Sequence, residues 1–293
     1  MHKTRYNALH LSVRIRPKGP LLIKAGGISA NPALPDMQFV RTFHPDQGET
    51  VYIPGASLKG VMRAFVEKAL RTLDDHESWR WACPTFPDEL GSCAKRLRDE
   101  TNTATVYRRS CGACRIFGHT RLRGRLSFTD FFPVEEVRTE IRYGVAISRL
   151  THAVAHGPFE MEVAVSGTFE GHLVLENFEI WQLGLVATAL AAMNQGLVKV
   201  GFGKNRGFGE VEAKVQEAWV DEVLVNYQPQ RLRGLMAFVD DNTRKAYSLF
   251  TPADLTLQNG SGFIREESLG VYTRRVFDTA GWEDLARLAI QAL

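Results

Sequence analysis

The sequence lacks long apolar runs and carries little net charge. No apolar run in its 293 residues approaches the length of a transmembrane helix, which needs about 18 residues. The first residues, "MHKTRYNALHLSVRIRP", contain no apolar core of signal-peptide length. A net charge of +3 with 24% charged residues argues against disorder and against a polycationic protein. We therefore expect a cytoplasmic protein without a membrane partner.

Cysteine is also scarce, and all four cysteines fall in residues 79–118, where hydrophobic periodicity is lost: Cys83, Cys93, Cys111 and Cys114. Disulfides are rare in cytoplasmic proteins, which favours metal binding or redox chemistry. A redox Cys-x-x-Cys needs a strand and a helix around "CGAC" and leaves Cys83 and Cys93 unexplained. The spacing therefore predicts a structural Zn²⁺ with four thiolates, which staples an insertion too small for its own core. His119 is a substitute ligand if one cysteine is free.

The remaining apolar residues follow strand and helix periods. "ALHLSVRIRP" alternates, which predicts a half-buried strand with a basic outer face. Helical spacing runs from Ser57, a candidate N-cap, to Leu73, and "FEIWQLGLVATALAAMNQG" predicts an apolar helix that ends at Gly196. Further strands are predicted in "RLSFTDFFP", "EMEVAVSGTFEGHLVLEN" and "GFGEVEAKV", and "GWEDLARLAIQAL" predicts a terminal helix.

The order of these elements is strand, helix, strand, repeated once. This order predicts an α+β fold with a ferredoxin-like core (split βαβ), an antiparallel sheet and helices on one face. We expect one domain over residues 1–293. It contains the zinc-binding insertion at 79–118, a projecting hairpin at 135–159 and a less regular C-terminal extension at 218–293.

The stretch "VGFGKNRGFGE" is the most glycine-rich part of the chain. It leads into a strand and lacks the GK[ST] ending, so neither a dinucleotide fingerprint nor a P-loop is present. Glycines beside cations allow backbone amides and positive charges to approach phosphates closely. The alternative is a hairpin with a charged tip. The candidate phosphate contacts are Gly201, Gly203, Lys204, Asn205, Arg206 and Gly207.

A second candidate phosphate site lies at the start of the helix in "PGASLKGVMRAF". A helix N-terminus offers unpaired amides and a positive dipole end. Ser57 lies at this end, and Lys59 and Arg63 lie one turn apart. The alternative is an ordinary amphipathic helix with a solvated polar face.

Together these motifs resemble the RAMP (repeat-associated mysterious protein) superfamily of CRISPR systems. "YIPGASLKGVMRAF" is similar to its signature helix, "GFGKNRGFGE" to its glycine-rich loop, and "CGACRIFG" to the cysteine motif of type III members. "AISRLTHAVAHGPFE" resembles the thumb segment of the backbone subunits. The resemblance runs in family order from about residue 9 to 215 and leaves the C-terminal quarter uncovered.

The resemblance implies an RRM-like subunit that binds CRISPR RNA and assembles with neighbouring RAMP subunits and other effector subunits. Its thumb, the hairpin at 135–159 with Arg149, would displace one nucleotide of the guide–target duplex at regular intervals. The subunit would then cleave the target RNA as an endoribonuclease, and it would use a loop aspartate together with Mg²⁺ or another divalent ion. The matching aspartate is Asp36, which precedes "MQFVR", and Arg41 at the end of that run is expected to contact RNA.

Other readings remain open. Asp46 also lies in the long loop, but "HPDQGET" is typical of a turn. His44 is a candidate acid or base, although a loop histidine is more often simply exposed. The chain is alternatively a non-catalytic RNA-binding or capping subunit, which does not need Asp36. A third reading is an endoribonuclease that processes the CRISPR RNA precursor, although the glycine loop has no histidine or tyrosine.

Overall fold

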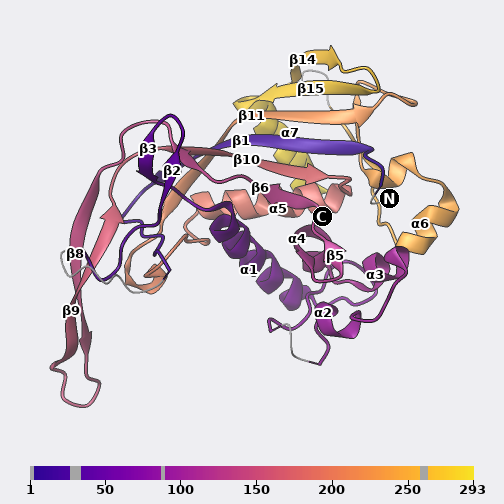
Figure 1. Cartoon of the computed structure of the whole chain (residues 1–293). Helices are drawn as coiled ribbons and strands as arrows, with labels where there is room; N and C mark the ends of the chain where they lie inside the picture. The colour runs from indigo at the N-terminus through magenta and orange to yellow at the C-terminus, as the bar shows by residue number, and fades with distance from the viewer. Residues whose placement is uncertain (1–2, 27–33, 87–89, 258–262) are drawn as a thin grey trace.

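The computed structural model describes residues 3–26, 34–86, 90–257 and 263–293. An antiparallel seven-stranded sheet forms its centre, with the order β14-β15-β11-β1-β10-β6 and with β7 also paired to β10 (Figure 1). The strands are β1 (Asn7–Pro17), β6 (Leu126–Phe128), β7 (Phe132–Pro133), β10 (Phe169–Glu176), β11 (Val211–Val223), β14 (Phe263–Ser268) and β15 (Tyr272–Asp278). The chain is thus an α+β protein, as the sequence predicts.

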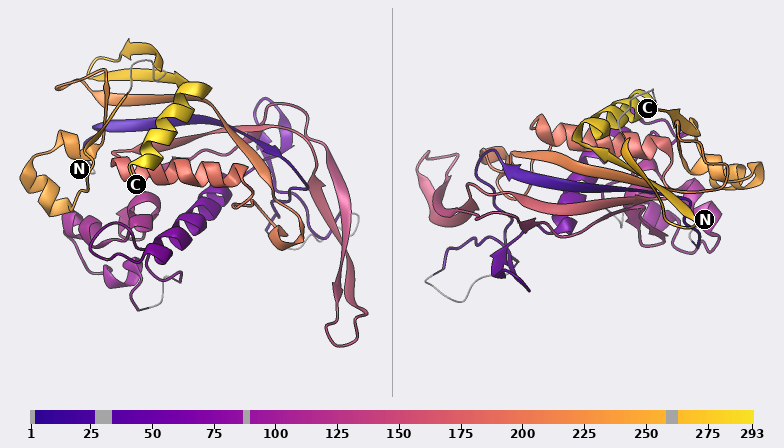
Figure 2. Two further views of the ribbon diagram at one scale, coloured as in Figure 1. Left: turned by 180° about the vertical axis from the view of Figure 1, so that it is seen from behind. Right: turned by 90° about the horizontal axis from the view of Figure 1, so that it is seen from above.

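The alternation of "ALHLSVRIRP" is confirmed in β1, the central strand. Leu9, Leu11, Val13 and Ile15 are buried, because every second side chain faces the helices. Helices α5 (Ile180–Asn194) and α7 (Thr279–Gln291) lie on the same face of the sheet (Figure 2). The predicted end of α5 is confirmed, since Gly196 follows the helix with φ at 73°.

Helix α1 (Gly55–Leu73) starts two residues before the predicted N-cap. Pro54 holds the N-cap position, so the prediction that Ser57 caps the helix is wrong. The first amide, Gly55 N, donates to Oδ1 of Asp130 at 2.8 Å. A Cβ at Gly55 would lie 2.4 Å from Thr129 O, so only glycine allows this close approach. The sequence did not show this capping because Asp130 lies 75 residues away.

The C-terminal quarter extends the main sheet. Strand β15 pairs with β11 and β14 pairs with β15, while α7 packs against α5. The terminal helix is thereby confirmed. The remaining elements here are β12 (Arg231–Arg233), β13 (Asp254–Thr256) and α6 (Asp241–Tyr247), with a 3₁₀ turn at Leu235–Phe238. Phe277 and Leu285 belong to the same hydrophobic core as β1.

Several small hairpins lie outside the main sheet. Strands β8 (Thr139–Ile147) and β9 (Val154–Ala164) pair and project away from the body (Figures 1 and 2). Three shorter pairs are β2 (Arg41–His44) with β3 (Gly48–Val51), β4 (Gly118–His119) with β5 (Leu122–Arg123), and β12 with β13. None of the helices in the described part of the chain has the length and apolar character needed to cross a membrane.

Candidate metal centre and nucleic-acid interface

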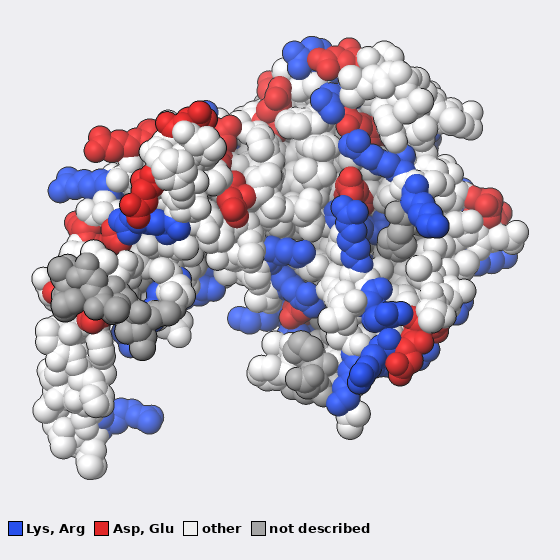
Figure 3. Space-filling model, in the orientation of Figure 1, with Lys and Arg blue, Asp and Glu red and all other residues white. Residues whose placement is uncertain are grey.

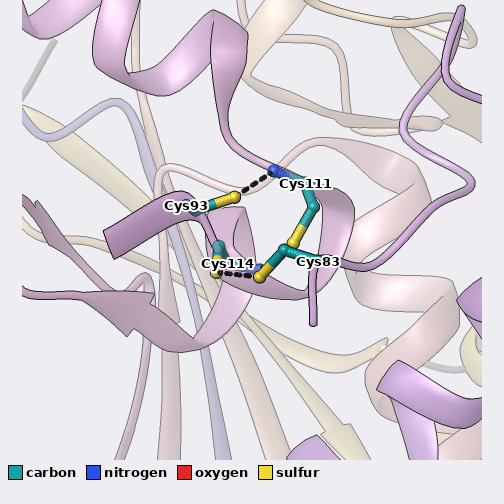
Figure 4. A group of neighbouring side chains, drawn as sticks. All are labelled: Cys83, Cys93, Cys111 and Cys114. Carbon is teal, nitrogen blue, oxygen red and sulfur yellow. Dashed lines mark hydrogen bonds between the residues drawn. The ribbon is translucent and has the colours of Figure 1, made fainter. Parts of the chain in front are cut away.

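The four cysteines converge on one buried point (Figure 4). Their sulfur atoms all lie within 4.8 Å of one another, and Cys83 Sγ lies 3.8 Å from Cys114 Sγ. A tetrahedral zinc with bonds of about 2.3 Å separates its sulfurs by roughly 3.8 Å. None of the four forms a disulfide. The group therefore fits a structural zinc ion.

Local backbone geometry prepares the sulfurs for a metal. Cys111 is the N-cap of α4 (Gly112–Phe117), and its Sγ accepts from Cys114 N at 3.4 Å. Cys93, at the start of α2 (Cys93–Arg96), accepts from Cys111 N at 3.3 Å. Backbone amides and a helix N-terminus stabilise thiolate charge. The hydrogen bond with Cys111 is the largest of the interactions that lower the pKa of Cys83.

Two arginines lie against the sulfurs. Arg63 Nη2 approaches Cys114 Sγ at 3.6 Å and Arg96 Nη2 approaches Cys93 Sγ at 3.8 Å. Four thiolates around a Zn²⁺ ion would carry two net negative charges, which these guanidinium groups would offset. Arg63 also binds Glu67 Oε1 at 2.8 Å and Gly118 O at 3.0 Å. Burial disfavours its charge, but Glu67 and Cys114 outweigh that effect and raise the pKa of Arg63.

His119 lies outside the sulfur group, which consists of the four cysteines alone. Its Nε2 lies 3.0 Å from Ser110 Oγ, and its Nδ1 accepts from Arg121 N at 3.3 Å. Burial lowers the pKa of His119. The histidine thus has hydrogen-bond partners of its own.

The segment that carries the four cysteines packs tightly on the main body. Tyr107, in α3 (Thr103–Arg109), donates its hydroxyl to Glu179 at 2.6 Å, and Trp79 stacks on Trp181 with ring centroids 4.6 Å apart. A Cβ at Gly112 would lie 2.1 Å from Trp79 O. The predicted insertion at 79–118, of which residues 87–89 lie outside the described part, therefore shares the hydrophobic core of the sheet.

The glycine loop exposes its cations at a tight turn. Its glycines at 201, 203, 207 and 209 have φ values from 71° to 84°, and a 3₁₀ turn spans Lys204–Arg206 between them. A Cβ at Gly201 would lie 2.2 Å from Leu22 O, so that glycine is needed for packing. Lys204, Asn205, Arg206 and Gly207 are exposed at the tip. Glycine thus shapes the loop, and its polar residues face solvent.

Several cations of this loop and of α1 lack an acidic partner in the described part of the chain. Among the described residues, Lys59, Lys204 and Arg206 form no salt bridge with any carboxylate. Burial, followed by the charge of Lys68, lowers the pKa of Lys204. Burial, followed by the charge of Arg63, lowers the pKa of Lys59. In Figure 3, Lys and Arg side chains gather over α1, whereas acidic side chains gather around β2 and β3. Uncompensated positive charge of this kind favours a polyanion.

The hairpin and the glycine loop meet at a hollow of about 510 Å³. Strands β8 and β9 contribute Tyr143 through Ile147 and Met161, and the loop contributes Arg206 and Phe208. Beyond the hollow, apolar side chains of the hairpin are exposed, among them Leu150 and Val154. Arg149 is exposed at the hairpin tip.

Asp36 is anchored at the base of the hairpin. Its Oδ2 accepts from Glu160 N at 3.0 Å, and its other oxygen accepts no hydrogen bond from any described residue. The neighbouring Met37 forms an isolated β-bridge with Met161, which lines the hollow. The structure therefore places an exposed carboxylate beside the hairpin. Residues 27–33 of the preceding loop lie outside the described part.

The other predicted residues of this region have structural partners. Asp46 lies in the turn between β2 and β3. His44 accepts from Asp46 N at 3.3 Å and lies 4.6 Å from the Phe132 ring. Arg41 binds both oxygens of Glu162, with Nη1 2.7 Å from Oε2, and this hydrogen bond raises the pKa of Arg41. The guanidinium of Arg41 is thus held by the hairpin.

Sequence reasoning missed three residues of this surface. Tyr143 and Phe208 line the hollow, and Lys68 lies close enough to Lys204 to lower its pKa. Lys68 is three turns along α1 from Ser57, on the same side. The helical period of α1 could have placed Lys68 on the same side as Ser57. No sequence pattern pointed to Tyr143 or Phe208.

A comparison with protein families now identifies the class of this protein. The family model described as the RAMP superfamily matches residues 14–212. The chain therefore belongs to the RAMP superfamily, whose members bind CRISPR RNA within CRISPR complexes and include ribonucleases. A search of curated proteins finds no match.

Proposed function

We propose that this chain is a backbone subunit of a type III CRISPR effector complex that binds guide RNA and cleaves the complementary target RNA. The proposal includes a ferredoxin-like, RRM-like core. The chain order β1, α1, β6, then β10, α5, β11, together with the sheet order β11-β1-β10-β6, supports two interleaved βαβ halves. Neighbouring copies and other effector subunits would be its protein partners.

The hollow between the hairpin and the glycine loop carries this proposal. Exposed cations attract the RNA backbone, and the exposed apolar hairpin offers surfaces that stack on or separate bases. Unstacking one base step costs a few kcal/mol, which contacts with such side chains would offset. The guide would therefore run past the loop tip, and the hairpin would separate one nucleotide from the duplex.

Asp36 is the proposed catalytic residue. A 2′-hydroxyl attacks its own adjacent phosphate when the nucleotide is held in line, and a separated nucleotide favours that geometry. The free carboxylate oxygen of Asp36 is suited to hold a hydrated Mg²⁺, which would stabilise charge on the phosphate, or to accept the hydroxyl proton. Arg41 would keep the base of the hairpin in place through Glu162.

Lys204→Ala and Arg206→Ala should each weaken RNA binding to a similar degree for all sequences, because both side chains would contact phosphates. Each lost contact should reduce the slope of log affinity against log salt by about 0.7 for single-stranded RNA. Filter binding across a salt series measures both quantities. Lys245→Ala, an exposed lysine on α6, is the matched control and should change neither. Unchanged affinity and slope in both loop variants would show that the loop is only a hairpin tip and does not contact RNA.

Shortening the hairpin should abolish regular cleavage and preserve the fold. Gly144 and Phe159 are directly paired, so residues 145–158 can be replaced by Asn-Gly, a favoured two-residue turn. The deletion removes exposed side chains such as Leu150 and keeps Tyr143 and Met161. Thermal melting and gel analysis of target cleavage test it. Cleavage at the original intervals would show that the hairpin does not set the spacing.

A further inference from the structure

A second group of arginines surrounds a small cavity near the N-terminus, at the opposite end of the sheet from the hairpin (Figure 1). The cavity measures about 70 Å³ and is lined by Arg5, Arg123, Arg125 and Glu176, with Thr4, Gly124 and Asn177 completing its wall. Its lining therefore has three guanidinium groups and a single carboxylate.

Arg125 is the unusual member of this group. Its side chain is only 7% exposed, and neither Nε nor Nη1 has a hydrogen-bond partner in the described part of the chain. Its guanidinium lies 4.5 Å from the centre of the Tyr107 ring, and that ring already carries Arg115 at 4.9 Å. A buried guanidinium with two nitrogens that lack hydrogen bonds is costly, so an anion within reach of this group would stabilise the protein.

The other two arginines leave the cavity positively charged. Arg5 Nη2 lies 3.0 Å from Asp221 Oδ2, outside the cavity lining. Arg123 lies 3.6 Å from Glu176, in a loose pair whose arginine side chain is 83% exposed. Guanidinium groups bind phosphate through paired hydrogen bonds, and a phosphate monoester carries about two negative charges at neutral pH.

We propose that this cavity binds a phosphate dianion, either inorganic phosphate or the terminal phosphate of a nucleic acid. The small volume suits a single phosphate group, and the charge of the lining matches a dianion. The inference does not depend on the proposed function, because the glycine loop and the hairpin contribute nothing to this cavity.

The test measures thermal stabilisation of the zinc-loaded protein by inorganic phosphate, against chloride at equal ionic strength. Wild-type protein should be stabilised, and Arg125→Gln should bind phosphate at least about tenfold more weakly. Arg123→Gln, an exposed change that leaves the core intact, should also weaken binding. Arg287→Gln on α7 is the charge-matched control and should bind as wild type. Zinc content and circular dichroism establish that each variant is folded.

A second arm uses one RNA with either a 5′-phosphate or a 5′-hydroxyl. If wild-type protein binds the 5′-phosphate RNA more tightly than the 5′-hydroxyl RNA, and Arg125→Gln removes this difference, the site binds RNA ends. Phosphate stabilisation without that gain assigns it to free phosphate. Two results would overturn the proposal: wild-type stabilisation no larger than that in chloride, or equal phosphate stabilisation in wild type, Arg125→Gln and Arg123→Gln.

Discussion

Cys114→Ser should release zinc and unfold the segment around it. Structural zinc binds with on the order of 10 kcal/mol, which is comparable to the whole free energy of unfolding of a typical domain. The loss should spread beyond the segment, because Tyr107 and Trp79 are packed against α5 and its N-terminus. Metal analysis should find about one zinc per chain in wild type, and the variant should melt far lower. Cys111→Ser should behave alike.

His119→Ala is the matched control for the zinc site. It removes a nearby metal-binding side chain that lies outside the sulfur group, so zinc content should stay the same. Protein prepared without chelator that contains no zinc would contradict the assignment. Equal zinc loss in His119→Ala and Cys114→Ser would contradict the four-cysteine ligand set.

Asp36→Asn should abolish target-RNA cleavage and leave RNA binding nearly intact. Asparagine can still accept the hydrogen bond from Glu160 N, so the base of the hairpin is preserved while the charge is lost. Loss of a carboxylate that holds a metal or accepts a proton typically lowers a rate at least about 100-fold. The assembled complex, guide and Mg²⁺ are the assay components, and a deoxynucleotide at one scissile position should block that cut alone.

Asp46→Ala is the comparison for Asp36. Asp46 lies in the β2–β3 turn, so its replacement should leave cleavage close to wild type. Full-rate cleavage by Asp36→Asn would mean that Asp36 is not catalytic or that another subunit makes the cut. Loss of cleavage in Asp46→Ala alone would move the catalytic role to the turn.

Elements with a strong local pattern were predictable from the sequence. The alternation of Leu9 to Ile15 predicts β1 because one face of that strand is buried. The cysteine spacing predicts the four-cysteine group because these residues lie close in the chain. The strands of the C-terminal quarter were missed. Strand β14 carries the largely exposed polar run "REES", which has no apolar alternation. It forms a strand because it pairs with the edge of β15.

The functions of individual charges were harder to predict, since their partners lie far away in sequence. Arg63 looks like a phosphate contact in the sequence, but its guanidinium lies against Cys114 and Glu67. Arg41 pairs with Glu162, 121 residues away. A role for either residue in RNA binding stays a prediction, as it does for Ser57 and Arg149. The cations of the glycine loop differ, because they pair with no carboxylate among the residues that the structure describes.

The most direct test of this account is the RNA that accompanies the protein from its native complex. The protein should be purified with its partner subunits, and the bound RNA sequenced. The account predicts CRISPR RNAs of defined length, and a marked reduction of that RNA when both Lys204 and Arg206 are replaced by alanine. A complex that carries no RNA, or cellular RNA without CRISPR sequences, would contradict it.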